Sequence, residues 1–250
     1  MGSTKSKWRN QQLAFYDGGT YETVRPVANQ YLFDDFFGTT LNADIWTGLD
    51  VGAGGGLVAP TGSYVSAAIG ALNENGADGI YGDGATGSRE WNIDHGWVFE
   101  ARVRMAVAPI NTVEMHIGMI GENYAAGSMC VAEADEINFH ALFVLDGAMT
   151  PVIYTDDGVA DNGPIATGVT AVIGEYNVYK IDATDVTNVL FYIDGVGVGT
   201  GTTFSLAGCA ADLMFQPWII IYKAADAGTN GAGTFRCDYV RIWQPERNHV

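Results

Sequence analysis

The chain has little positive charge, few cysteines and no long hydrophobic run. Its 250 residues hold 12 lysines and arginines against 29 aspartates and glutamates, a formal net charge of −17. This balance argues against a nucleic-acid-binding protein, because phosphates demand a basic face. No stretch approaches the roughly 20 apolar residues of a membrane span, and the N-terminus has no apolar signal core. We therefore expect neither a nucleic-acid partner nor a membrane partner.

The cysteines are three in number and far apart. Cys130, Cys209 and Cys237 make neither a disulfide framework nor a zinc pattern, because the count is odd and the spacing wide. We expect buried free thiols, which fits a protein assembled in a reducing compartment.

Glycine and apolar residues are plentiful. The 33 glycines fit a protein of many short strands and turns, and a hydrophobic content of 48% is ample for a core. A chain of this length fits one all-β domain, which we place at residues 31–250. The glycine-rich stretches 48–62 and 73–89 are predicted to be loops.

Residues 1–30 are predicted to form a separate N-terminal arm. Residues 1–25 carry a net charge of +2, whereas the remainder carries −19. The arm is also too rich in large apolar groups for a disordered tail. We expect it to dock on a partner; the alternative is a strand packed on its own domain. The candidate partner-binding residues are Trp8, Arg9, Leu13, Phe15, Tyr16 and Tyr21.

Three successive segments alternate between apolar and polar residues, as half-buried strands do. The predicted inward residues are Trp97, Phe99, Ala101, Val103, Met105 and Val107, then Val113, Met115, Ile117 and Met119, then Ile137, Phe139, Ala141, Phe143 and Leu145. If the strands are neighbours, their other sides form one polar face. That face would hold Arg102, Arg104, Glu114, His116, Glu136, Asn138 and His140. An ordinary solvated or subunit-facing surface is the alternative to a binding face.

The segment 213–223 is apolar on both sides, which predicts a strand covered on each face. A subunit interface is the natural candidate for the extra cover. Pro217 predicts an edge strand or a bulge, because proline cannot donate to a sheet ladder.

The stretch 178–199 reads as strand, loop, strand, turn and strand, with Asp194-Gly195 as a strong hairpin signal. Its segment Phe191-Tyr192-Ile193-Asp194-Gly195 resembles a motif of the concanavalin A-like lectin/glucanase jelly rolls. The opening segment, residues 32–46, and the closing segment, residues 237–243, resemble the end strands of the laminarinase-like members. The resemblance implies a two-sheet antiparallel jelly-roll sandwich with an extended N-terminal arm.

Laminarinase-like glycosidases carry three carboxylates on one strand, in the pattern E-x-D-x-E or E-x-D-x-x-E. Glu133 and Asp135 match the first two positions, but the third falls on Ile137 or Asn138. Neither residue can donate a proton to a leaving group. The phase of the strand also aligns Glu133 and Asp135 with core-facing residues. We therefore expect a protein that is not an enzyme.

The resemblance also implies a structural calcium ion, because this fold often holds one. Asp238 is the aspartate of the closing strand, and it would lie near Asp34 of the opening strand. Carboxylate oxygens suit a hard cation. The alternative for this and other acidic turns is ordinary Asx-turn geometry. No other cofactor is expected.

Three functions remain from different classes. The arm, the free cysteines and the broken carboxylate triad together resemble the capsid decoration (cement) proteins of tailed bacteriophages. That resemblance implies a homotrimer bound to the major capsid protein on the virion surface. The alternative is a lectin-like module for cell-surface glycans, with Trp46, Trp91, Trp97 and Tyr124 as candidate stacking residues. A glycoside hydrolase is the third.

Overall fold

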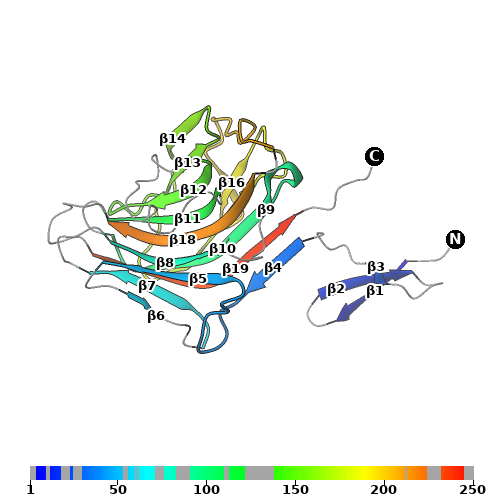
Figure 1. Ribbon diagram of the computed structural model, residues 1–250, viewed down its shortest axis with the longest axis horizontal. Helices are drawn as coiled ribbons and strands as arrows, with labels where there is room; N and C mark the ends of the chain where they lie inside the picture. The colour runs from blue at the N-terminus through cyan, green and yellow to red at the C-terminus, as the bar shows by residue number, and fades with distance from the viewer. Residues whose placement is uncertain are drawn as a thin grey trace.

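The structure is a computed structural model in which strands make up most of the described chain (Figure 1). It describes residues 4–9, 12–17, 23–24, 30–52, 56–58, 60, 62–70, 76–82, 91–109, 113–121, 138–211, 213–223 and 232–244. For residues up to Gln30, and for Val58, only the strand position is described. The one helical element there is a single turn, η1 (Ile93–His95), and no described helix is long and apolar enough to cross a membrane.

Two eight-stranded antiparallel sheets form the body of the molecule. One, here the β10–β19 sheet, runs in the order β17 (Val196–Val198), β16 (Leu190–Ile193), β15 (Asn177–Asp182), β10 (Val98–Val107), β19 (Gly233–Gln244), β7 (Val65–Ile69) and β6 (Gly56–Val58), and β4 (Gln30–Asp34) also pairs with β19. The other, the β11–β18 sheet, runs β14 (Asp161–Ala166), β13 (Val152–Asp156), β12 (His140–Leu145), β11 (Val113–Gly121), β18 (Met214–Lys223), β8 (Gly76–Gly82) and β5 (Trp46–Val51), and β9 (Trp91–Asn92) also pairs with β18.

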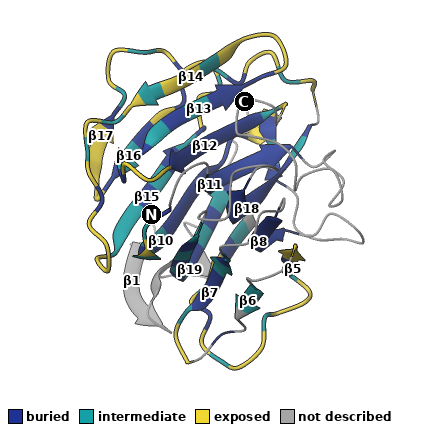
Figure 2. Ribbon diagram, turned by 90° about the vertical axis from the view of Figure 1, so that its left-hand side faces the viewer, coloured by how far each residue is buried: buried dark blue, intermediate teal, exposed yellow. Residues whose placement is uncertain are grey.

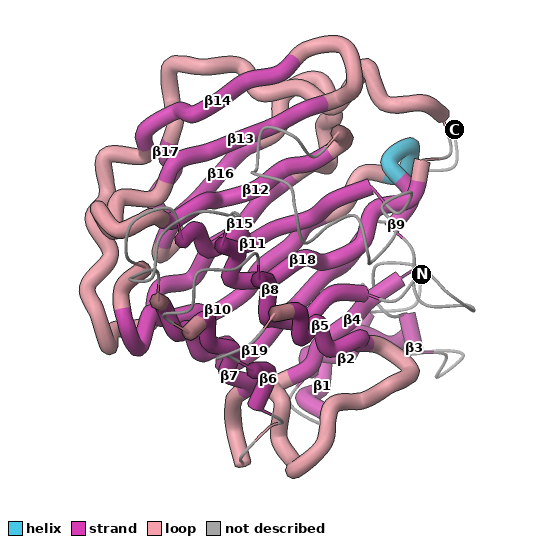
Figure 3. Tube along the Cα trace, turned by 60° about the vertical axis from the view of Figure 1, so that its left-hand side comes forward, coloured by secondary structure: helices cyan, strands magenta, loops and turns pink. Residues whose placement is uncertain are grey.

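The two sheets stack as a sandwich, and the main core lies between them (Figure 3). Phe143 of β12 meets Tyr179 of β15 and Phe191 of β16, with both ring-centroid distances at 5.2 Å. The alternation of β10, β11 and β12 is confirmed for all but one of the described residues predicted to face inward. Val107 is the exception, since it is exposed at the end of β10. An all-β sandwich follows from this repeated pattern.

The predicted hairpin forms between β16 and β17, where Ile193 pairs with Val196. Asp194 and Gly195 both have positive φ, at 50° and 78°, as a two-residue hairpin turn requires. The Asp194 carboxylate accepts hydrogen bonds from the Val178 N–H at 2.8 Å and from Asn177 Nδ2 at 2.7 Å. The turn is therefore tied to the strand β15 beside it.

The glycine-rich segment 73–89 was predicted to be a loop, and this prediction is wrong for β8. That strand is buried along its length between β18 and β5. Its glycines are required by close packing: a Cβ on Gly79 would lie 2.3 Å from the Ile219 carbonyl oxygen. The stretch 48–62 likewise contains β5 and β6.

Pro217 lies in a central strand, so the predicted edge position is also wrong. On one side it pairs with Met119 of β11. On the other side, the described pairing of β18 with β8 ends at Trp218, and that with β9 begins at Phe215. Proline, which has no N–H to give to a ladder, therefore occupies the gap between two partner strands.

The arm strands β1 (Thr4–Arg9), β2 (Gln12–Asp17) and β3 (Thr23–Val24) form a three-stranded antiparallel sheet of their own. None of them pairs with a described strand of the sandwich. Figure 1 shows this small sheet beyond β4, outside both layers of the body.

Candidate functional site

The outer side of the β11–β18 sheet is apolar. Strand alternation turns every second residue of β11, β12 and β18 away from the core, and the register aligns these residues in rows. The resulting cluster is called the apolar face here. It consists of Leu49, Ala77, Tyr81, Ile120, Leu142, Val144, Trp218, Ile220 and Tyr222. All nine are buried within the single chain, so a second subunit is not needed to cover them. Figure 2 shows β11, β12 and β18 in the dark blue of buried residues.

Polar side chains interrupt the apolar face at a few places. His116 Nε2 lies 3.1 Å from Glu114 Oε2, and the imidazole lies 6.0 Å from the ring of Tyr222. Trp218 packs against Tyr81 at 5.8 Å. Among the described residues, three buried polar atoms on β11 and β18 have no hydrogen-bond partner, namely His116 Nδ1, Trp218 Nε1 and Gln216 Oε1. The indole nitrogens of Trp91 and Trp97 in the main core are in the same state, so this feature alone does not mark a ligand site.

The described strands of this face do not supply a row of three carboxylates. On β12 the outward positions are His140, Leu142 and Val144. Glu114 of β11 and Asp156 of β13 both point outward, but they lie at opposite ends of the sheet. Asp156 aligns through His140 with Ile120, which lies about 20 Å along β11 from Glu114 at the usual rise per residue. Retaining hydrolysis needs carboxyls about 5–5.5 Å apart. Glu133, Asp135 and Glu136 lie outside the described residues, and Asn138 is exposed.

The predicted polar face does not form as one surface. β10 belongs to the β10–β19 sheet, whereas β11 and β12 belong to the β11–β18 sheet. Arg102 and Arg104 therefore lie on the opposite side of the sandwich from Glu114, His116 and His140. The prediction failed because alternation shows which residues share a side of a strand, but not which sheet the strand joins.

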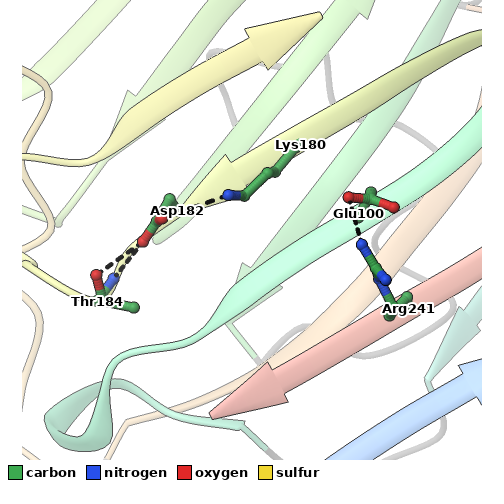
Figure 4. A network of polar contacts seen from close by, with 5 residues as sticks. All are labelled: Glu100, Lys180, Asp182, Thr184 and Arg241. Carbon is green, nitrogen blue, oxygen red and sulfur yellow. Dashed lines mark hydrogen bonds and ion pairs between the residues drawn. The ribbon is translucent and has the colours of Figure 1, made fainter. Parts of the chain in front are cut away.

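The outer side of the β10–β19 sheet is charged. This charged face comprises Glu100, Arg102, Arg104, Lys180, Asp182, Arg236, Asp238 and Arg241. Glu100 accepts hydrogen bonds from Arg241 Nη2 and from Tyr239 Oη, both at 2.8 Å. Figure 4 shows Glu100 and Arg241 beside a second ion pair, that of Lys180 and Asp182, whose charged atoms lie 3.6 Å apart. Burial, and secondarily the bond to Glu100, raises the pKa of Tyr239.

Both residues proposed for calcium have other partners in the structure. Asp34 accepts hydrogen bonds from Trp46 Nε1 and from the Phe36 N–H, both at 2.8 Å. Asp238 is paired with Arg102. Among the described residues no three His, Cys, Asp or Glu side chains converge as a metal site. In the acidic loop that follows β13, Asp157 accepts hydrogen bonds from three backbone N–H groups, those of Val159, Ala160 and Gly208. That is Asx-type turn geometry rather than a ligand set.

The candidate stacking residues Trp46, Trp91 and Trp97 all belong to the main core, so none of them is offered to a ligand. Tyr124 lies outside the described residues. Cys237 is fully buried and free, and burial raises the pKa of its thiol. Cys209 is also free, and burial raises its pKa to about 12, whereas Cys130 lies outside the described residues.

The register of the arm places its residues on two sides. Trp8 pairs with Leu13, and Ser6 pairs with Phe15. In an antiparallel sheet, positions Trp8, Leu13 and Phe15 thus share one side. Positions Lys5, Lys7 and Arg9 fall on the other side, with Tyr16 opposite Lys5. Tyr21 lies outside the described residues.

A pocket of about 280 Å³ opens on the body where the chain enters it from the arm. Phe33 of β4 and Phe37 line it and are 50% and 82% exposed. Large exposed aromatic side chains beside a pocket are typical of a binding surface. Sequence reasoning missed this pocket because Phe33 and Phe37 resemble ordinary core residues of an opening strand.

No family model and no curated protein matches the chain. Several solved structures do match. One is the catalytic domain of an endo-1,3-beta-glucanase (laminarinase) from Thermotoga petrophila RKU-1, at 12% identity and TM-score 0.58, covering 88% of this chain and 100% of the other. The chain has the concanavalin A-like fold. An endo-acting O-glycanase of the human gut microbiota matches at 11% identity and TM-score 0.59, over 86% and 99% of the two chains. The Emp47p carbohydrate recognition domain matches at 9% identity and TM-score 0.55, covering 86% of this chain and 95% of the other.

Proposed function

We propose that this protein is a non-catalytic structural protein of a tailed-bacteriophage virion, a decoration protein that grips the major capsid protein with its N-terminal arm. One observation carries the proposal: the arm forms its own sheet and pairs with no described strand of the body. Such an arm is available to a partner. Its register gathers Trp8, Leu13 and Phe15 on one side, and aromatic residues commonly anchor interfaces.

The body supports the same proposal in two ways. The pocket lined by the exposed rings of Phe33 and Phe37 lies beside β4, the first strand after the arm. The third position of the glycosidase carboxylate pattern falls on Ile137 or Asn138, so we propose that the fold serves here as a scaffold. A weak contact of this kind gains strength when many copies bind a symmetric shell. A trimer at local threefold positions is part of the proposal.

The test is binding of the full chain to capsid shells of the virus that encodes it, measured by co-sedimentation. We expect the double variant W8A/F15A to reduce binding by at least about tenfold, since each anchor contributes on the order of 1–2 kcal/mol. The control is V159A, an exposed body position. Unchanged binding by W8A/F15A would contradict attachment through the arm.

Glycan binding is the second candidate function, and it is favoured by the likeness of the fold to a carbohydrate recognition domain and by the exposed rings beside the pocket. Phe33 and Phe37 offer ring faces to a ligand, and Asn42 in the lining offers a polar side chain. Sugars are recognised by a combination of ring faces and hydrogen bonds. A glycan array with wild type and F37A tests it: binding lost in F37A supports this function, and an array without hits contradicts it.

A further inference from the structure

Two arginines face each other on the charged face. The register pairs Arg104 of β10 directly with Arg236 of β19. The row of Glu100, four residues earlier on β10, is different, because there Glu100 stands between Lys180 and Arg241 and balances their charge. Like charges directly opposite each other in a sheet are destabilising. The chain thus keeps an unfavourable pair in a protein whose net charge of −17 offers many carboxylates to neutralise it.

Each of the two guanidinium groups is held by a tyrosine instead of a carboxylate. The Arg104 guanidinium lies 4.8 Å from the ring centre of Tyr176, and that of Arg236 lies 4.7 Å from the ring of Tyr64. Arg104 also donates to the Gly174 carbonyl oxygen at 3.0 Å. The other cations of this face each have an acidic partner: Arg102 has Asp238, Arg241 has Glu100 and Lys180 has Asp182.

Neither Arg104 nor Arg236 therefore has an ion pair among the described residues, although the Arg102–Asp238 pair lies at the same Tyr176 ring. The Nε atoms of Arg104 and Arg236 are without a hydrogen-bond partner there, as is that of Arg241. Stacking on a tyrosine ring fixes the plane of a guanidinium while leaving N–H donors at its edge. The register places the two side chains opposite each other on neighbouring strands, with the two tyrosine rings flanking the pair. An oxyanion over the pair would accept charge-assisted hydrogen bonds from both arginines.

We propose that Arg104 and Arg236, oriented by Tyr176 and Tyr64, form an oxyanion-binding site for the sulfate or carboxylate group of a compact ligand. A long polyanion is disfavoured, because the rest of the molecule is strongly acidic and would repel it. The site is independent of capsid attachment and of glycan binding, so either of those can fail without affecting it.

The test is calorimetric titration of the full chain with sodium sulfate, and separately with glucuronate, at low ionic strength. We expect R104Q/R236Q to weaken binding by about tenfold or more, as the loss of charge-assisted hydrogen bonds does. The matched control is K180Q/R241Q, which removes the same charge from the same face. Its affinity should stay within about twofold of wild type. Binding of sulfate alone, of glucuronate alone or of both identifies the group that the site accepts.

Two results would overturn the proposal. One is no binding of either anion by the wild type. The other is an equal loss in R104Q/R236Q and K180Q/R241Q, which would mean a diffuse positive field without a site.

Thermal unfolding without anion gives a second readout. Relief of the like-charge contact should raise the melting temperature of R104Q/R236Q, whereas K180Q/R241Q should lower it. A lower melting temperature for R104Q/R236Q would show that the two arginines stabilise the fold. It would contradict a binding site that is kept although it destabilises the folded state. The single variants serve if the double variant does not fold.

Discussion

The two outer faces of the sandwich differ in how they meet water. On the charged face the arginines are partly exposed, with Arg102 and Arg241 at 41% and 40% side-chain exposure. On the apolar face Trp218 and Ile220 are fully buried. Both faces come from the same strand alternation, so the difference lies in which residues the outward positions carry.

The comparison teaches that one fold can assign its two outer faces to different roles. A charged face stays soluble alone because its ion pairs and cation–aromatic contacts are compatible with water. An apolar face must be covered, and the burial of Trp218, Ile220 and Tyr222 in the single chain shows that this has happened. Loss of an apolar side chain should therefore cost more than loss of an exposed charge.

Truncation of a covered aromatic residue should have the largest effect. We expect W218A to lower the free energy of unfolding by about 3–5 kcal/mol, because it removes a fully buried indole and leaves a cavity. The matched control is W243A on the charged face, which is only half-buried and should lose clearly less. Urea denaturation measures the free energy of unfolding of both variants. Equal losses would mean that burial on the apolar face stabilises the protein no more than the partly exposed charged face does.

Removal of the central carboxylate of the charged face should have an intermediate effect. E100Q takes the negative charge from between Arg241 and Tyr239, which donate to it at 2.8 Å. We expect the free energy of unfolding to fall by about 1–2 kcal/mol. This is less than the loss of a fully buried ion pair would cause, because Arg241 is partly solvated. D182N at the neighbouring, longer pair is the control. A loss in D182N as large as that in E100Q would contradict the ranking.

A pH-dependent effect of similar size should come from the paired carboxylates on β5 and β8. Burial, and then its hydrogen bond to Asp50, raises the pKa of Asp78 to about 7. The folded state thus holds a proton that the unfolded chain releases near pH 4. Stability from this pair is complete below about pH 4 and falls as the pH rises to about 7.

The variant D78N should remove that slope, which we expect to be roughly 1–2 kcal/mol between pH 4 and 8. Urea midpoints of wild type and D78N across this range measure it, with D146N at an exposed turn as the control. A wild-type profile that rises with pH in parallel with D78N would contradict a shared proton.

The smallest effect should come from an exposed ion pair. K180Q breaks the 3.6 Å contact with Asp182, and both side chains are partly solvated. We expect a change below about 0.5 kcal/mol that shrinks further in salt. Thermal melts at low and high salt measure it. A larger, salt-independent loss would mean that Lys180 contributes mainly by packing on Tyr192, 5.0 Å from its Nζ.

Much of the fold could be predicted because local chemistry agrees with it. The alternation of β10, β11 and β12, the Asp194-Gly195 turn and the doubly apolar β18 all follow from residue periodicity and turn preference. β8 could not be found, because its glycines leave no side-chain pattern, and only the contact of Gly79 with β18 explains them.

The candidate sites were harder to predict, because they depend on which strands become neighbours. Arg102 and Glu114 sit on successive strands, yet they lie on opposite sides of the molecule. The pairing of Arg104 with Arg236 joins residues far apart in the chain, and nothing local announces it. Alternation already predicted that Trp97 faces inward, but nothing local to Trp46 and Trp91 showed that they also belong to the core.

The most direct test of the arm as a separate attachment unit is the native mass of two chains by light scattering, the full chain and one lacking residues 1–29. The truncated chain keeps β4, which begins at Gln30 and pairs with β19. The account predicts the same oligomeric state for both chains, because the arm is proposed to bind the capsid and not to join copies of the body. A mass that falls on truncation would make the arm a clasp between subunits and contradict its proposed role as a grip on the capsid.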